Sequence, residues 1–184
     1  FEAAWGVSLS DKEVLTHAEI FDDIHDGKIT SLYLIGENPY LSEANANHAI
    51  ESMNRLDFLV VQDIFLTETA ELADVVLPAA SFAEKNGTFS NTERRVQRVR
   101  KAIDSPGEAL PDWQITAAIA NRMGANGFDF EDEAQIMREI ASVTPSYGGI
   151  SYDRLEGDGL QWPCPSPDHP GTPTLHVGKF GTPS

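Results

Sequence analysis

Three short runs of β-forming residues, separated by helical patterns, constrain the fold of this chain more than any other feature. The runs are residues 29–35, 56–61 and 73–78, and each has the length of an ordinary strand. The middle run is apolar except for Asp57, which is typical of a strand buried on both faces of a sheet. Strands that alternate with helices favour βαβ units and a parallel sheet. We therefore expect an α/β fold with a Rossmann-like, open and mostly parallel sheet flanked by helices.

The segments before, between and after these runs carry helical signals. Their expected starting points, in chain order, are Ser10 or Asp11, Ser42-Glu43, Thr67, Asp112 and Glu131. Ser, Thr and Asp are favoured there because their side chains accept hydrogen bonds from the free backbone N–H groups of a helix start. In the first helix, Val14 and Leu15 would share an apolar stripe with Phe21. Gly27 and Gly124 are expected to end the first and the fourth helix.

Two segments depart from this alternation. Residues 82–100 are polar and contain four arginines, and we expect a loop followed by an irregular strand there. From Thr144 onward glycine and proline dominate, which indicates loops. The expected organisation is an α/β domain over residues 1–143 and a Gly/Pro-rich extension over residues 144–184. A start without Met and an end without a structural stop are what we expect of a piece of a longer protein.

The charge balance excludes some classes of partner. The chain has 29 acidic and 13 basic residues, for a formal net charge of −16. Such a surface repels DNA, RNA and anionic lipid, so a nucleic-acid-binding role is excluded. The acids are dispersed along the chain, which favours a folded protein with an acidic surface over a disordered acidic tail. With only five lysines, the composition is typical of a salt-rich cytosol, where ions screen the repulsion; an ordinary acidic cytosolic protein is the alternative.

The cysteine and histidine content offers little metal chemistry. The single cysteine, Cys164, excludes an internal disulfide and a zinc or iron–sulfur site built from cysteines alone. It lies between two prolines, which favours a structural role over a nucleophilic one. His48 and His169 have no partner at metal-ligand spacing, so we interpret both as surface residues. No apolar run is long enough to span a bilayer and no signal peptide is recognisable, so we expect a cytoplasmic location.

Polar residues and a glycine follow the ends of the expected strands. In an open parallel sheet, ligands bind at the carboxyl ends of the strands. Gly36 lets a ligand approach the backbone closely, and Asn38, Gln62 and Asp63 offer amide and carboxylate groups for ribose hydroxyls or a purine edge. Asp112, at a helix start, offers a carboxylate that matches the adjacent N1 and N2 donors of guanine.

Each of these features also has a plain structural explanation. Gly36 could only close a turn, Asn38-Pro39 is a common turn initiator, and Asp112 could only cap its helix. The arginines of residues 94–100 could bind phosphate or simply balance the acidic surface. Taken one at a time, the residues leave a nucleotide site and an ordinary loop edge both open.

Taken in chain order, these segments are far more specific. They are Leu34-Ile35-Gly36-Glu37-Asn38-Pro39, Val60-Val61-Gln62-Asp63-Ile64-Phe65, Thr67-Glu68-Thr69-Ala70, Ala73-Asp74-Val75-Val76-Leu77-Pro78, residues 87–97 and Asp112-Trp113-Gln114-Ile115. Together they closely resemble the molybdopterin oxidoreductase family and, within it, the catalytic subunit of formate dehydrogenase. Trp162-Pro163-Cys164 and Lys179-Phe180 are also similar to that subunit, so the resemblance covers nearly the whole chain.

The resemblance implies a role in cofactor binding. The family's catalytic subunit holds a bis(molybdopterin guanine dinucleotide) cofactor between two α/β domains, and this chain resembles the second of them. The residues that the resemblance assigns to a guanosine site are Gly36, Glu37, Asn38 and Ser42, with Gln62 and Asp63 beside them, Ala79 through its backbone, and Asp112 on the guanine. Ala79 stands where some relatives have a hydroxyl residue, so a side-chain hydrogen bond is absent there.

The resemblance places the reacting centre elsewhere. The family's selenocysteine or cysteine ligand to molybdenum or tungsten, its neighbouring histidine and the cysteines of a 4Fe-4S cluster match no residue here. The expected parent protein oxidises formate to carbon dioxide and passes electrons to the cluster and to electron-transfer subunits. This chain would support binding and orientation and would be inactive alone. Its expected partners are the remaining domains of that parent.

Three other assignments remain open from the sequence. The large iron–sulfur subunit of NADH–quinone oxidoreductase shares the fold and can lack the cofactor, although retention of Gln62, Asp63 and Asp112 favours a site that binds guanosine. Nitrate reductases are a further member of the same family. The alternative from another class is a free-standing α/β nucleotide-binding module.

The acidic composition makes a prediction about salt. If the surface is adapted to a salt-rich cytosol, its self-repulsion is unscreened in dilute buffer and screened over a few Å in molar salt. We expect the melting temperature of the isolated chain to rise between dilute buffer and molar KCl. A melting temperature that is the same in both buffers contradicts the adaptation to salt.

Overall fold

The computed structural model of the chain describes residues 1–178, so the resemblance noted at Lys179-Phe180 lies outside the described residues. These residues form two compact units. The parallel-sheet unit comprises residues 8–81 and 105–115, and the antiparallel-sheet unit comprises residues 1–7, 82–104 and 116–178. No helix within residues 1–178 combines the length and the apolar character that crossing a membrane requires.

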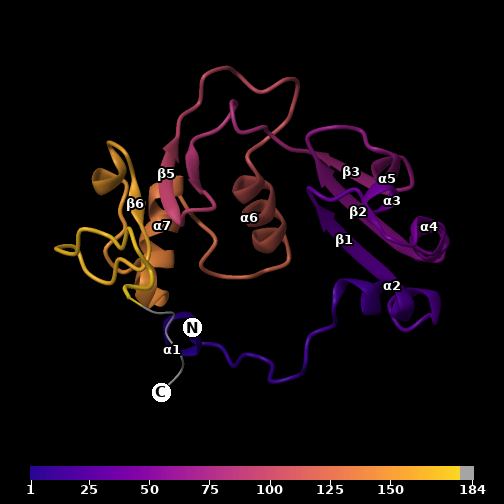
Figure 1. Ribbon diagram of the computed structural model, residues 1–184. Helices are drawn as coiled ribbons and strands as arrows, with labels where there is room; N and C mark the ends of the chain where they lie inside the picture. Colours follow the sequence, from indigo (N-terminus) through magenta and orange to yellow (C-terminus); the bar gives the residue numbers. More distant parts are fainter. Residues whose placement is uncertain (179–184) are drawn as a thin grey trace. The chain divides into compact units, whose positions relative to one another are not determined.

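The parallel-sheet unit is built on three strands that run in the same direction. β1 (Ser31–Ile35), β2 (Phe58–Asp63) and β3 (Val75–Pro78) lie side by side in the order β1-β2-β3, with β2 in the centre (Figure 1). Parallel strands require a crossover connection, and here helical segments supply both crossovers. The expected α/β fold with a parallel sheet is therefore confirmed.

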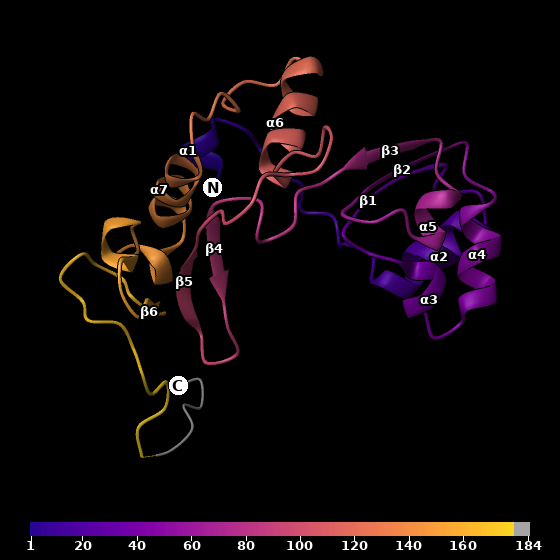
Figure 2. The same ribbon diagram turned by 90° about the horizontal axis from the view of Figure 1, so that it is seen from above.

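Four helices of this unit, α2 (His17–His25), α3 (Pro39–Ser42), α4 (Ala46–Met53) and α5 (Glu68–Glu71), cluster beside the sheet, as Figure 2 shows. Three of them bury apolar side chains against the central strand. The buried core consists of Phe21, Ile24, Ala49, Met53, Leu59, Val61 and Ala70. Burial of this kind contributes about 25 cal/mol for each Å² of apolar surface removed from water, so this face of the sheet anchors the unit.

The opposite face of the sheet carries a different set of side chains. Successive residues of a strand point to opposite faces, and the register pairs Tyr33 with Val60 and Ile35 with Gln62. Tyr33 and Ile35 are 37% and 46% exposed. Gln62 is an exception, because it has no solvent exposure at all. A fully buried amide must find its hydrogen-bond partners inside the protein, and this requirement directs attention to the edge where β2 ends.

The antiparallel-sheet unit differs from the expectation for its first segment. Residues 82–100 were expected as a loop and an irregular strand, but they form the hairpin β4 (Gly87–Ser90) and β5 (Arg95–Val99), to which β6 (Leu160–Gln161) adds a third strand. The expectation was wrong because Asn91, at the hairpin turn, accepts hydrogen bonds from the backbone N–H groups of residues 93 and 95. Such an Asx turn offers the backbone local partners that polar composition alone does not reveal.

The rest of this unit consists of helices and turns, some of which pack on the hairpin. It contains α1 (Glu2–Trp5), α7 (Glu133–Val143), the 3-10 turns Pro145–Tyr147 and Asp153–Leu155, and the part of α6 (Asp112–Arg122) that follows Ile115. Its buried core consists of Val96, Met137, Ile150, Leu155 and Cys164. Cys164 is fully buried, and its Sγ lies 3.4 Å from Nη1 of Arg154 and from the carbonyl oxygen of His169. This cysteine therefore packs as a structural residue.

The arginines of residues 94–100 have partners within the unit. Arg95 lies 2.8 Å from Glu93, while Arg98 and Arg100 lie 3.0 and 2.7 Å from the two carboxylate oxygens of Glu156. These ion pairs favour the interpretation that the cluster balances acidic side chains.

Arg94 has a different, structural role. It occupies the left-handed backbone region with φ 68° at the hairpin turn. Its guanidinium donates to the carbonyl oxygens of Trp162 and, at 3.0 Å, of Thr172. This side chain therefore ties the C-terminal loops to the β-hairpin.

The sequence predicted only some of the helix starts correctly. The first helix was expected from Ser10 or Asp11, but α2 begins at His17 and Val14 is 86% exposed. The reason is a capping box. Thr16 accepts from the backbone N–H of Glu19, and the Glu19 carboxylate accepts from the backbone N–H of Thr16 at 2.7 Å.

The second expected helix is α4, which begins at Ala46, whereas Ser42 is the last residue of the short helix α3. Ser42-Glu43 was expected to begin this second helix, but Asn45 caps α4 through its side-chain oxygen, which accepts from the backbone N–H of His48. The turn at Thr67 and the helix from about Glu131 were placed correctly, with Thr67 and Asp132 as caps of α5 and α7. Gly124, with φ 82°, follows the end of α6 as expected.

The capping box of α2 makes a prediction about pH. The backbone N–H of Thr16, and then its hydroxyl, hold the pKa of Glu19 below its ordinary value. A lowered carboxyl pKa stabilises the fold above the ordinary pKa, and this contribution is lost as the pH falls through the lowered value. Thr16→Ala removes the hydroxyl but keeps the backbone N–H, so we expect the pKa of Glu19 to rise part of the way toward normal in an NMR titration.

A matched control for this titration is Thr30→Ala. Thr30 is exposed and makes no side-chain hydrogen bond among the described residues. The Glu19 titration should be the same in this variant and in the wild-type chain. An unchanged Glu19 pKa in Thr16→Ala shows that the hydroxyl does not contribute.

Candidate functional site

The candidate site lies at the edge of the parallel sheet where the three strands end (Figure 1). The backbone N–H of Gly36, just after β1, donates to the carbonyl oxygen of Gln62 at 2.9 Å. The N–H of Ala79, just after β3, donates to the carbonyl oxygen of Asp63 at 3.0 Å. Backbone pairing therefore brings four of the expected site residues together in one row across the sheet.

A further backbone pairing brings Asp112 to the same edge. The N–H of Ala80 donates to the carbonyl oxygen of Leu110 at 2.8 Å, and the N–H of Leu110 donates to that of Pro78 at 3.2 Å. Leu110 is thus paired alongside the continuation of β3, only two residues before Asp112. Asp112 is the first residue of α6 rather than the residue before it, and its side chain turns to the sheet edge.

Gln62 and Asp112 meet in a partly buried hydrogen bond. Nε2 of Gln62 donates to Oδ1 of Asp112 at 2.7 Å. The other polar atom of the amide, Oε1, accepts from the hydroxyl of Tyr33 on the neighbouring strand. Because Gln62 is fully buried, these two bonds satisfy an amide that water cannot reach. The carboxylate of Asp112 is thereby held by an element 50 residues away in the chain.

Asn38 is used within the protein. Its Nδ2 donates to Oε2 of Glu68 at 2.9 Å, and its Oδ1 accepts from the hydroxyl of Thr69 at 2.6 Å. The same hydroxyl oxygen of Thr69 accepts from the backbone N–H of Tyr40 at 3.1 Å. The side chain of Asn38 therefore ties the loop after β1 to the start of α5 and sets the path of residues 36–42.

The remaining expected residues differ in exposure. Glu37 and Ser42 are exposed, and no described residue contacts their side chains through a hydrogen bond. Asp63 is half-buried, and its Oδ1 accepts from the backbone N–H of Phe65 at 3.1 Å. Gly36 has φ 65° and open space where a Cβ would project, so it supports a turn in which the backbone can be reached from outside.

The chemistry of this donor and acceptor set fits a nucleoside and not a phosphate. Three of the eight expected residues, Glu37, Asp63 and Asp112, are acidic, and none is basic. Carboxylates and carbonyl oxygens accept hydrogen bonds from ribose hydroxyls and from purine N–H groups. A phosphate group would be repelled by the same charges. These eight residues therefore offer hydrogen-bond acceptors to a nucleoside and no cationic side chain to a phosphate.

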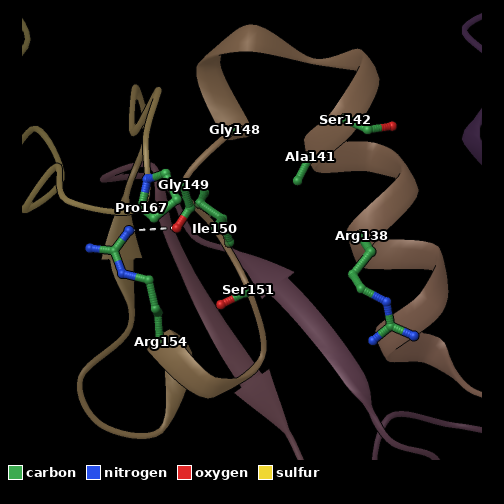
Figure 3. A pocket seen from close by; sticks show the side chains of 9 residues that line it. All are labelled: Arg138, Ala141, Ser142, Gly148, Gly149, Ile150, Ser151, Arg154 and Pro167. Carbon is green, nitrogen blue, oxygen red and sulfur yellow. Dashed lines mark hydrogen bonds between the residues drawn. The ribbon is translucent and has the colours of Figure 1, made fainter.

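A separate hollow lies within the antiparallel-sheet unit and contains none of the expected site residues. Its volume is about 320 Å³, and it is lined by residues of α7 and of the following loops, including Arg138, Ser142, Gly149 and Arg154. Figure 3 shows that the guanidinium of Arg154 turns to the carbonyl oxygen of Gly149. This arginine is therefore engaged in holding the loop.

The two histidines interpreted as surface residues are both half-buried. Nε2 of His48 lies 3.0 Å from Oδ1 of Asp22, and Nδ1 of His169 accepts from the backbone N–H of Gly171 at 3.1 Å. Across residues 1–178, no three His, Cys, Asp or Glu side chains are arranged so that they could hold a metal ion.

Two residues of the site were not found from the sequence. Tyr33 and Thr69 each supply a hydroxyl that donates to the side-chain oxygen of a predicted site residue, Gln62 or Asn38. Tyr33 could have been suspected, because it lies two residues before Ile35 and therefore on the face that Gln62 shares in a parallel register. Thr69 carried no such signal, since the four-residue helix α5 that it belongs to has no face that sequence periodicity can identify.

The buried hydroxyl of Thr69 makes a prediction about stability. Thr69→Val keeps the shape of the side chain but leaves the Tyr40 N–H without its acceptor. It also removes one of the two donors to Oδ1 of Asn38, which keeps the backbone N–H of Thr69. An unsatisfied buried group costs about 1–3 kcal/mol, so we expect the free energy of unfolding, measured by denaturant titration, to fall by that amount. Thr30→Val, at an exposed threonine of the same unit, should leave it nearly unchanged. Equal effects of the two substitutions contradict this role of Thr69.

Comparisons with known proteins identify the family. The family model described as molybdopterin oxidoreductase matches residues 8–122, which is more than half of the chain. The F420-dependent formate dehydrogenase 2 subunit alpha of Methanococcus maripaludis is 51% identical over 100% of this chain and 27% of its own length. The F420-dependent formate dehydrogenase subunit alpha of Methanocaldococcus jannaschii is 52% identical over 99% of this chain and 27% of its own length.

A solved structure supports the fold. Acetylene hydratase from Pelobacter acetylenicus superposes with a TM-score of 0.64 at 21% identity, covering 77% of this chain and 20% of that protein. The chain spans about a quarter of the length of the two formate dehydrogenase subunits that it matches. The ordered motifs, the parallel sheet and the family match agree, and the chain belongs to the molybdopterin oxidoreductase family.

Proposed function

We propose that this chain binds the guanosine portion of a molybdopterin guanine dinucleotide within the alpha subunit of a formate dehydrogenase. The observation that carries the proposal is the Asp112 carboxylate, held by Gln62 at the carboxyl edge of the parallel sheet. This is the place where open α/β sheets bind nucleotides. The formate dehydrogenase assignment is supported by relatives about half identical over the whole chain.

The proposed contacts follow from the chemistry of the edge. Guanine presents two neighbouring N–H donors, N1 and N2, and a carboxylate accepts both. Asp112 would therefore select guanine over adenine, which lacks this donor pair. Gln62 would orient the carboxylate, with Asp63 beside it. Gly36, Glu37, Asn38, Ser42 and the backbone of Ala79 would line the nucleoside.

The remaining features of the full-length protein belong to the same proposal. The cofactor would be the bis(molybdopterin guanine dinucleotide) form with molybdenum or tungsten, ligated outside this chain, beside a 4Fe-4S cluster held by another domain. When bound, the cofactor supplies the two-electron oxidation of formate to carbon dioxide, with release of a proton. This chain's residues bind and orient it. Residues 144–184 would lead toward the next domain, electron-transfer subunits would be partners, and the location would be cytoplasmic.

The alternatives differ in what the edge binds. In the large iron–sulfur subunit of NADH–quinone oxidoreductase, the same fold would be structural and the edge would bind no guanosine. A nitrate reductase would keep the guanosine site and change the substrate, which other domains select. A free-standing nucleotide-binding module would bind guanine nucleotide without a pterin. The hydrogen bond between Gln62 and Asp112 favours an edge that binds guanosine over one that is only structural.

The experiment is a substitution of Asp112 in the full-length protein. Asp112→Ala removes a charged hydrogen-bond acceptor, a change of about 1–3 kcal/mol, so we expect cofactor retention to fall about 5- to 150-fold. The readout is the amount of GMP released by acid hydrolysis per mole of purified protein.

The matched control is Asp11→Ala, which removes an exposed carboxylate of the same unit that contacts no described residue through a hydrogen bond or ion pair. GMP release should be equal in this variant and in the wild-type protein. Wild-type GMP release from Asp112→Ala contradicts the guanosine site. Released AMP in place of GMP contradicts the choice of base.

A further inference from the structure

The polar contact between Gln62 and Asp112 continues to a third element. The hydroxyl of Tyr33, on β1, donates to Oε1 of Gln62, on β2, and Nε2 of Gln62 donates to Oδ1 of Asp112, at the start of α6. The three side chains form one row of hydrogen bonds. Tyr33 is 29 residues from Gln62, and Gln62 is 50 residues from Asp112.

The direction of this row is determined by chemistry. Nε2 of Gln62 donates to Oδ1 of Asp112, which matches the NH₂ group of the amide to a carboxylate oxygen that accepts. The amide oxygen then faces Tyr33 and accepts its hydroxyl proton. Gln62 has no exposed surface, so its amide relies on partners inside the protein. The orientation of the amide therefore depends on both ends of the row.

We infer that Tyr33 is a positioning residue for guanine selection: through Gln62, its hydroxyl fixes the orientation of the Asp112 carboxylate. The inference rests on the proposed guanosine site and adds to it a residue that would not touch the ligand. A carboxylate accepts from the N1 and N2 donors of guanine together only when its plane is held in line with the purine edge. The Gln62 hydrogen bond to Oδ1 holds that plane, and Tyr33 holds Gln62.

Loss of the Tyr33 hydroxyl has a defined consequence. In Tyr33→Phe the ring remains, but Oε1 of Gln62 loses its partner inside the protein. The amide is then free to rotate about its terminal bond and to release Asp112. A lost hydrogen bond of this kind corresponds to about a three- to tenfold change in an equilibrium or rate constant. The effect should appear in the binding of guanine nucleotide although the inferred role of Tyr33 requires no contact with it.

The test measures release of the guanine nucleotide from the full-length holoprotein during dialysis. Retained cofactor is quantified as GMP after acid hydrolysis, a readout that does not require enzymatic activity. The variants are Tyr33→Phe, Asp112→Asn and the double variant. The control is Tyr40→Phe, which removes a phenolic hydroxyl of the same unit that has no hydrogen-bond partner among the described residues.

The expected result is a coupled effect. Tyr33→Phe should release GMP about three- to tenfold faster than wild type, and Tyr40→Phe should match wild type. In the Asp112→Asn background the additional effect of Tyr33→Phe should shrink toward none, because residues that act through one another are not additive. This coupling distinguishes positioning of Asp112 from a general loss of stability.

The contrary outcomes separate the two proposals. Wild-type release from Asp112→Asn overturns the guanosine site itself. Faster release from Asp112→Asn with wild-type release from Tyr33→Phe overturns only the positioning role of Tyr33. The positioning role is also overturned if the increase in the rate of GMP release in the double variant equals the product of the increases in the two single variants. Tyr33 would then act independently of Asp112.

Discussion

The buried amide of Gln62 is the constraint on which the candidate site depends. An amide without access to water must satisfy its donor and acceptor inside the protein, and the partners are Tyr33 on one side and Asp112 on the other. The register of β1 and β2 brings the first partner, and the pairing of Leu110 beside the continuation of β3 brings the second. One buried side chain thus links the sheet to the start of α6.

The loop after β1 is organised by a second buried group in the same way. Thr69 has no exposed surface, and its hydroxyl connects Asn38 to the backbone of Tyr40. The edge of the sheet is therefore held by hydrogen bonds at Gln62 and Thr69, which are buried, and is exposed at Glu37 and Ser42. Acceptors that are held in place beside an exposed surface suit a site that must bind a ligand in one orientation.

The sequence predicted the elements with strong local signals. The three strands lie within two residues of their expected starts, and the carboxyl-end residues Gly36, Gln62 and Asp63 do lie in one row. The start of α2 was misplaced because Thr16 forms a reciprocal capping box with Glu19, whereas the side chain of Ser10 accepts only from the backbone N–H of Lys12, outside any helix. The hairpin over residues 87–99 was missed because antiparallel pairing depends on partners that polar composition does not specify.

The sequence by itself determined the class of fold, the family and the types of residue at the strand ends, because apolar periodicity and ordered motifs are local properties of the chain. Only the tertiary structure decided which of those residues touch. The contacts of Gln62 with Tyr33 and Asp112 join segments 29 and 50 residues apart, and they exist because of a particular strand register and one backbone pairing at Leu110. A shift of one residue in that register would turn Gln62 to the other face of the sheet, with the same sequence and no site.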